Sequence, residues 1–147
     1  ADFEERWEAV MAVNAKGTML MCHAAVDAMR QTGGGAIVNV SSAAARLGSA
    51  GEYVDYAASK GAIDTFTRGL AQEVAEEGIR VNAVRPGVID TDIHASGGEP
   101  GRVERIKASI PLKRGGRPEE VARAIMWLLS SESSYTTGAL LEVSGGR

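Results

Sequence analysis

Hydrophobic residues recur along the chain at two spacings, one typical of helices and one of buried strands. Between residues 3 and 30, apolar or small side chains recur every three or four positions, which predicts one long helix. The side chains expected to share its face are Phe3, Trp7, Val10, Asn14, Gly17, Met21, Ala24 and Ala28. A second helix is expected from about residue 52 to 77, ended by Gly78, and a third is expected to begin at Pro118.

Three short segments that follow these helices are strand candidates, at residues 36–40, 80–84 and 139–143, and the first of them is almost wholly apolar. Such segments are typical of strands covered on both faces, and strands that alternate with helices predict a parallel sheet. A complete doubly wound nucleotide-binding fold has about six strands in two halves. We therefore expect one α/β domain over residues 1–147, the C-terminal half of a Rossmann-like doubly wound parallel sheet with flanking helices, without the first βαβ units.

Composition narrows the class of protein. The 147 residues carry a net charge of −3, which argues against a nucleic-acid-binding protein because no basic stripe is present. One cysteine and two histidines argue against disulfides and a metal site. No apolar run approaches the roughly 20 residues that span a bilayer, and no signal peptide is recognisable, so we expect a cytoplasmic protein. The chain begins with Ala1 rather than Met, which suggests a piece of a longer protein.

The most informative motif is Tyr56-Ala-Ala-Ser-Lys60, near the start of the second predicted helix. A spacing of four places the phenol and the ammonium on one helix face. Tyrosine normally titrates near pH 10, and a neighbouring cation favours the phenolate. The pair could therefore serve as a general acid/base. For an isolated pair, the alternative of a surface aromatic lying on a lysine stem is commoner.

Two loops are predicted to meet at one edge of the sheet. Ser42 follows the first strand, and the segment from Pro86 to Thr91 follows the second. Ligands of open parallel sheets bind outside the carboxyl ends of the strands. Asn14 adds a polar amide to an otherwise apolar helix face. Taken singly, Ser42 could be a turn or cap residue, and Asn14 a buried amide that fixes the register of packed helices.

Together, Asn14, Ser42, Tyr56 and Lys60 resemble the catalytic tetrad of the short-chain dehydrogenase/reductase family. The resemblance covers essentially the whole chain. Its other motifs are Val13-Asn-Ala-Lys-Gly17, Ile37-Val-Asn-Val-Ser-Ser42, Gly78-Ile-Arg-Val-Asn-Ala-Val-Arg-Pro-Gly87, Arg117-Pro-Glu-Glu-Val121, Thr137-Gly138 and Gly145-Gly146. Each motif alone is weak, but their order and spacing make the match specific.

The resemblance implies an oxidoreductase that uses NAD or NADP to interconvert an alcohol and a ketone or aldehyde. Tyr56 would be the general acid/base. Lys60 would lower the pKa of Tyr56 and hydrogen-bond the nicotinamide ribose. Ser42 would hold and polarise the substrate oxygen, and Asn14 would anchor a water that relays protons from Lys60.

The same resemblance assigns residues to the cofactor and to a lid over the substrate. Pro86, Gly87, Ile89 and Thr91 would contact the nicotinamide and its carboxamide. A loop from about residue 92 to 110 would close over the substrate, bringing Asp92 and His94 near it. A solvated loop histidine is the alternative for His94.

The chain departs from the family's pattern at its beginning. Family members open with a strand and a Gly-rich turn whose amides meet the cofactor pyrophosphate, and no such strand and turn is found here. The residue that selects NAD or NADP belongs to the same part. If the chain is complete, it should bind cofactor weakly or not at all, and it could then be a catalytically silent oligomerisation module.

Assembly and substrate follow from the resemblance only in outline. A homo-oligomer, either a dimer or a tetramer, is expected through the helices at residues 3–30 and 52–77, because the second helix presents a row of small residues. The substrate would be a small alcohol or carbonyl compound. The sequence is similar to glucose 1-dehydrogenases and to 3-oxoacyl carrier-protein reductases alike. A sugar epimerase or dehydratase with a similar Tyr/Lys pair is a further alternative.

Overall fold

The computed structural model describes residues 2–147 as a parallel sheet covered by helices on both faces. Its three strands are β1 (Gly35–Val40), β2 (Ile79–Pro86) and β3 (Leu140–Val143), in the order β1-β2-β3. The helices are α1 (Phe3–Met11), α2 (Thr18–Thr32), α3 (Ala44–Leu47), α4 (Val54–Val74), α5 (Ile93–Ser96), α6 (Arg102–Ile106) and α7 (Pro118–Leu129). The predicted α/β class with a parallel sheet is confirmed.

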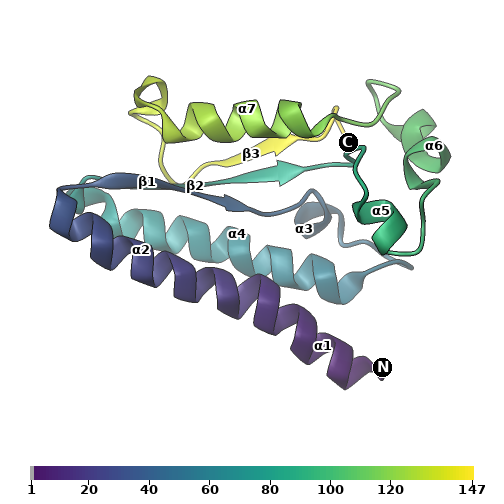
Figure 1. The fold of residues 1–147 in the computed structure, drawn as a ribbon, viewed down its shortest axis with the longest axis horizontal. Coiled ribbons are helices and arrows are strands. Elements are labelled where there is room, and N and C mark those ends of the chain that lie inside the picture. The colour runs from purple at the N-terminus through teal and green to yellow at the C-terminus, as the bar shows by residue number, and fades with distance from the viewer. Residues whose placement is uncertain (1) are drawn as a thin grey trace.

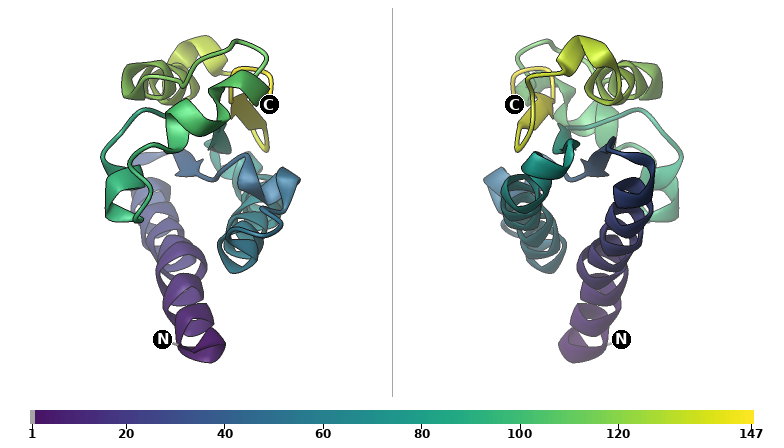
Figure 2. Two further views of the ribbon diagram at one scale, coloured as in Figure 1. Left: turned by 90° about the vertical axis from the view of Figure 1, so that its right-hand side faces the viewer. Right: turned by 90° about the vertical axis from the view of Figure 1, so that its left-hand side faces the viewer.

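The helices form one layer on each side of the sheet (Figures 1 and 2). Helices α2 and α4 contact β1 and β2 from one side, while α7 contacts all three strands from the other. Gly35 of β1 pairs with Ile79 of β2, and Ala83 of β2 pairs with Leu140 of β3. Because all strands run in the same direction, their carboxyl ends meet at one edge, where α3, α5 and α6 also lie (Figure 1).

The long N-terminal helix confirms one prediction and corrects another. It runs from Phe3 to Thr32, but a π-helical segment, η1 (Ala12–Gly17), separates α1 from α2. A π turn takes more residues than an α turn, so it rotates the following side chains around the axis. The buried residues are consequently Ala15, Cys22 and Val26, whereas Met21 of the predicted face is 72% exposed. The predicted face was wrong beyond Asn14, and before Asn14 its first residue, Phe3, is exposed as well.

The same helix also changes the expectation about membranes. At 30 residues, it is long and apolar enough to cross a bilayer by length and composition, which no apolar run in the sequence had suggested. A core helix of a water-facing domain satisfies the same criterion. Here α2 packs on β1 and α4.

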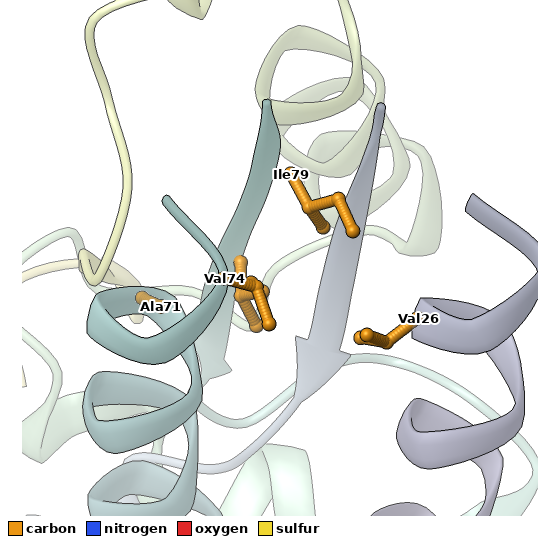
Figure 3. Close-up of a cluster of buried hydrophobic side chains, with 5 residues drawn as sticks. Val26, Ala71, Val74 and Ile79 are labelled. Carbon is orange, nitrogen blue, oxygen red and sulfur yellow. The ribbon is translucent and has the colours of Figure 1, made fainter. Parts of the chain in front are cut away.

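A hydrophobic cluster fixes the two long helices to the sheet (Figure 3). Val26 comes from α2, Ala71 and Val74 come from α4, and Ile79 and Val81 come from β2; all are at most 3% exposed. Ile79 is the first residue of β2. This cluster therefore lies toward the amino ends of the strands and leaves their carboxyl ends to the polar groups described below.

Helix boundaries agree with the sequence where capping residues define them. Helix α7 begins at Pro118 as predicted, and the turn that continues α4, η2 (Ala75–Glu77), ends at Gly78. Gly78 has a φ of +73°, the left-handed conformation that glycine adopts readily. The short helices α3 and α5 were not predicted. Helix α6 is followed by a 3₁₀ turn, η3 (Lys107–Ser109), and another such turn, η4 (Ser131–Ser133), follows α7.

Candidate active site

Tyr56 and Lys60 lie together on the first turns of α4. The Lys60 Nζ atom is 5.6 Å from the centroid of the Tyr56 ring, as their spacing predicts. Lys60 Nζ also donates a hydrogen bond of 2.9 Å to the carbonyl oxygen of Val40, the last residue of β1. Burial lowers the pKa of Lys60, and the nearby Asp64 carboxylate opposes this effect. The ammonium is thus held between the end of a strand and the phenol ring.

Asn14 is connected to the backbone of Tyr56 through a serine that the sequence analysis missed. The Asn14 side-chain amide donates to Ser59 Oγ at 3.1 Å, and Ser59 Oγ donates to the Tyr56 carbonyl oxygen at 2.7 Å. Ser59 is fully buried. Its position three residues after Tyr56, on the same helix face, was the available signal. The π-helical segment carries Asn14 to this contact.

The two serines after β1 have different environments. Ser41 is 2% exposed, and its hydroxyl donates to the Lys60 carbonyl oxygen at 3.3 Å. Ser42 is half-buried, and its hydroxyl oxygen accepts the Ala44 amide at 3.1 Å. Ser42 therefore has the cap-like contact that a turn serine would make. Of the two, Ser42 is the more accessible hydroxyl at the end of the strand.

The loop after β2 reaches the same edge of the sheet. The Pro86 carbonyl accepts the Ala43 amide at 2.9 Å, which ties this loop to the one that carries Ser42. Gly87 donates its amide to the Val143 carbonyl at 3.0 Å, and a Cβ atom at Gly87 would lie 2.8 Å from the Cα of Ser144. A side chain is therefore excluded at Gly87. The three strand ends are fixed close to one another.

The remaining predicted cofactor and lid residues continue this loop. Ile89 bridges to Gly116, and Thr91 Oγ1 accepts the Ile93 amide at 3.4 Å. Asp92 is exposed at the start of α5. His94 is half-buried, and its Nε2 lies 2.6 Å from the Ile89 carbonyl oxygen. His94 is therefore held against the strand-end loop, unlike the solvated histidine that the alternative interpretation described.

Asp55, which the sequence analysis did not single out, anchors the backbone of Tyr56. Its carboxylate accepts the Tyr56 amide at 2.9 Å and an Arg6 guanidinium nitrogen at 2.7 Å, although the side chain is almost wholly buried. Burial raises the pKa of Asp55, but the Arg6 guanidinium and the backbone amide together bring it below its usual value. No sequence spacing predicts this pair, because Arg6 comes from α1.

Among residues 2–147, no three His, Cys, Asp or Glu side chains lie close enough to hold a metal ion. The residues described above bring a phenol, an ammonium, a hydroxyl and an amide to this end of the sheet. Such a set can hold a substrate oxygen and exchange a proton with it.

Known proteins similar to this chain are oxidoreductases. The family model described as enoyl-(acyl carrier protein) reductase matches residues 3–147. The chain is 62% identical over 146 residues to the uncharacterized oxidoreductase YgfF of Escherichia coli, and it covers 59% of that protein. It is 42% identical to the 3-oxoacyl-[acyl-carrier-protein] reductase FabG of Chlamydia pneumoniae, of which it covers 57%. In both comparisons 97% of this chain is covered.

Two solved structures of dehydrogenases also match this chain. A short-chain type dehydrogenase/reductase from Mycobacterium ulcerans matches with a TM-score of 0.89 at 35% identity, over 97% of this chain and 52% of that protein. Acetoin dehydrogenase YohF from Salmonella typhimurium matches with a TM-score of 0.83 at 36% identity, over 97% of this chain and 55% of that protein. The chain thus spans little more than half the length of the proteins that it matches.

Proposed function

Because the chain belongs to the short-chain dehydrogenase/reductase family, we propose that it carries the proton-transfer half of an NAD- or NADP-dependent oxidoreductase. The reaction would interconvert an alcohol and a ketone or aldehyde. The observation that carries this proposal is the Lys60 ammonium, 5.6 Å from the centre of the Tyr56 ring at the carboxyl edge of a parallel sheet. Ligands of such sheets bind at that edge.

Each side chain has a role that its contacts support. When bound, the nicotinamide would supply or accept the hydride. The Tyr56 phenol would give its proton to the substrate oxygen during reduction and take it back during oxidation. Lys60 would stabilise negative charge on the Tyr56 oxygen. The Ser42 hydroxyl would donate a hydrogen bond to the substrate oxygen as charge develops there.

The residues around Lys60 fit the nicotinamide end of the cofactor. An ammonium has three donors, and Val40 takes one of them, so two are left for ribose hydroxyls. Asn14 would hold a water beside Lys60 through the part of its amide that Ser59 does not use. Gly87, where a side chain is excluded, would let the loop of Pro86, Ile89 and Thr91 approach the carboxamide.

The pyrophosphate end of the cofactor would be bound by a Gly-rich turn at the start of a helix. None of the strands in the described part is followed by a Gly-rich turn that opens a helix. We therefore propose that residues 1–147 form one domain, the catalytic C-terminal part of the fold. The free edge of β1 and the adjoining apolar groove, lined by Val13, Met21 and Ile37 among others, are where further strands would join the sheet.

The substrate belongs to this proposal only as a class. The chain is 42% identical to a reductase named for 3-oxoacyl-[acyl-carrier-protein] and also to the rat (3R)-3-hydroxyacyl-CoA dehydrogenase. We propose a small alcohol or carbonyl compound as the substrate. A cytoplasmic setting is part of the same proposal.

Titration with cofactor tests the proposed function directly. The protein expressed from its complete coding sequence would be titrated with NADH and with NADPH, and binding followed by nicotinamide fluorescence. We expect saturable binding of at least one of them. Absence of binding at millimolar cofactor would contradict the proposal and favour a silent assembly module with the same fold.

We also propose a homo-oligomer, a dimer or tetramer formed through the helices at residues 3–30 and 52–77. Ala58, Thr65 and Gly69 form an exposed row of small residues on α4, and a Cβ atom at Gly69 would meet open space. Gly69→Arg should therefore leave the fold intact but prevent a close approach between helices. We expect this variant to shift the mass measured by light scattering toward the monomer. Ala108→Arg, at an exposed position outside these helices, should not, and a monomeric parent protein would contradict the proposal.

A further inference from the structure

Four charged side chains connect the segment carrying α5 and α6 to the residues just before α4. Arg102 Nη2 donates to Glu52 Oε2 at 2.6 Å, and Arg105 Nη2 lies 3.5 Å from Glu52 Oε1. Glu99 also contacts both arginines, at 3.1 Å from Arg102 Nη1 and 2.5 Å from Arg105 Nε. Two arginines of α6 thus share one carboxylate from their own segment and one from the turn that leads into α4.

Arg102 is the most enclosed member of this network. Its side chain is 16% exposed, against 30% for Glu52, and its Cζ lies 5.8 Å from the centroid of the Tyr53 ring. Arg6 of α1 approaches the same ring, at 5.7 Å. The Arg102 guanidinium holds the pKa of Glu52 below its usual value. A partly enclosed pair of this kind is screened by salt less than a fully exposed one.

The network meets α4 next to the proposed catalytic residues. Glu52 precedes Tyr56 by four positions, and the amides of Glu52 and Tyr53 both donate to the Ser49 carbonyl. Helices α5 and α6 lie at the same end of the molecule as the start of α4 (Figure 1). Further attachments of the segment are provided by the contact of His94 with Ile89 and by an apolar cluster of Val88, Val103, Ile106 and Ile110.

We propose that Glu52, Glu99, Arg102 and Arg105 form an ionic latch that holds residues 93–106 closed against the start of α4, and that breaking the Glu52–Arg102 pair lets the segment open. The apolar cluster, which does not depend on charge, would keep the α6 end of the segment attached to the loop after β2 while the rest of the segment opens. The idea that this segment covers a substrate rests on the proposed function. The latch itself does not depend on that function. Ion pairs of this exposure are weak individually, so such a latch favours the closed form while still permitting opening.

Hydrogen exchange measured by mass spectrometry tests the latch without cofactor or substrate. The variants are Glu52→Gln, Arg102→Gln and the two together. We expect the amides of residues 93–106 to exchange about fivefold faster in each single variant, because local opening becomes easier. The double variant should exchange no faster than the singles, since residues that interact give non-additive effects. Glu104→Gln is the matched control, because Glu104 is also on α6 but is 74% exposed and pairs with Lys107 of the adjoining 3₁₀ turn rather than with Glu52.

Several outcomes would overturn the latch. Exchange in Glu52→Gln equal to that in wild type or in Glu104→Gln would do so, and so would single effects that simply add in the double variant. Unchanged circular dichroism would exclude a general loss of fold as the cause of faster exchange. Because the assay uses no cofactor, a failure of the latch and a failure of the proposed oxidoreductase function give separate results.

Discussion

Replacing Tyr56 by phenylalanine is expected to lower turnover by about a thousandfold while leaving the fold intact, within the range that general acid/base groups contribute. In the described part of the chain, the Tyr56 hydroxyl has no hydrogen-bond partner, and Asp55 and Ser59 contact only the backbone of Tyr56. Loss of the hydroxyl should therefore change the free energy of unfolding by less than about 0.5 kcal/mol. Steady-state carbonyl reduction with saturating cofactor would measure the first effect, and denaturant unfolding the second.

Tyr135→Phe provides the control for this variant. Tyr135 is wholly exposed beyond α7, outside the proposed site, so its hydroxyl should not affect turnover. If Tyr56→Phe retained substantial turnover, the role given to Tyr56 would be wrong. Loss of stability together with activity would show instead that the hydroxyl supports the fold.

The elements of the fold were predictable where local chemistry defines them. The short segments after the helices predict the three strands of the described residues, and Pro118 and Gly78 mark helix boundaries that the structure reproduces. The helix face beyond Asn14 was not predictable, because a π turn leaves no period of its own in the sequence. The short helices α3 and α5, of four residues each, are too brief to produce a hydrophobic period.

The candidate site was predictable to a similar extent. The spacing of Tyr56 and Lys60 predicts their contact, and the strand-end rule places Ser42 and Gly87 at one edge. Ser59 and Asp55 were missed because their partners, Asn14 and Arg6, come from a helix more than 40 positions away in the chain. Contacts between distant segments depend on how the helices pack, which hydrophobic spacing alone does not determine.

Replacing Arg85 by methionine is expected to cause the largest loss of stability among the substitutions considered. Arg85 lies on β2, and its guanidinium donates to Asp64 Oδ2 from Nη2 at 2.7 Å and from Nε at 3.0 Å. The Asp64 side chain is 7% exposed and that of Arg85 is 15% exposed. Without Arg85, the Asp64 carboxylate would remain buried without its partner, which typically costs about 3–5 kcal/mol. Circular dichroism during denaturant unfolding would measure this loss.

Two further variants separate the buried charge from the loss of the arginine side chain. Combining Arg85→Met with Asp64→Asn removes the unpaired carboxylate, so the double variant should recover much of the lost stability. Arg30→Met breaks the exposed pair with Glu77 and should change stability little, because both groups regain water. A double variant as unstable as the sum of its parts would contradict the argument. The Asp64 carboxylate also raises the pKa of Lys60, so Asp64→Asn should lower the pKa of Lys60 further. The ion pair of Asp64 and Arg85 is in this way connected to the proposed chemistry of Lys60.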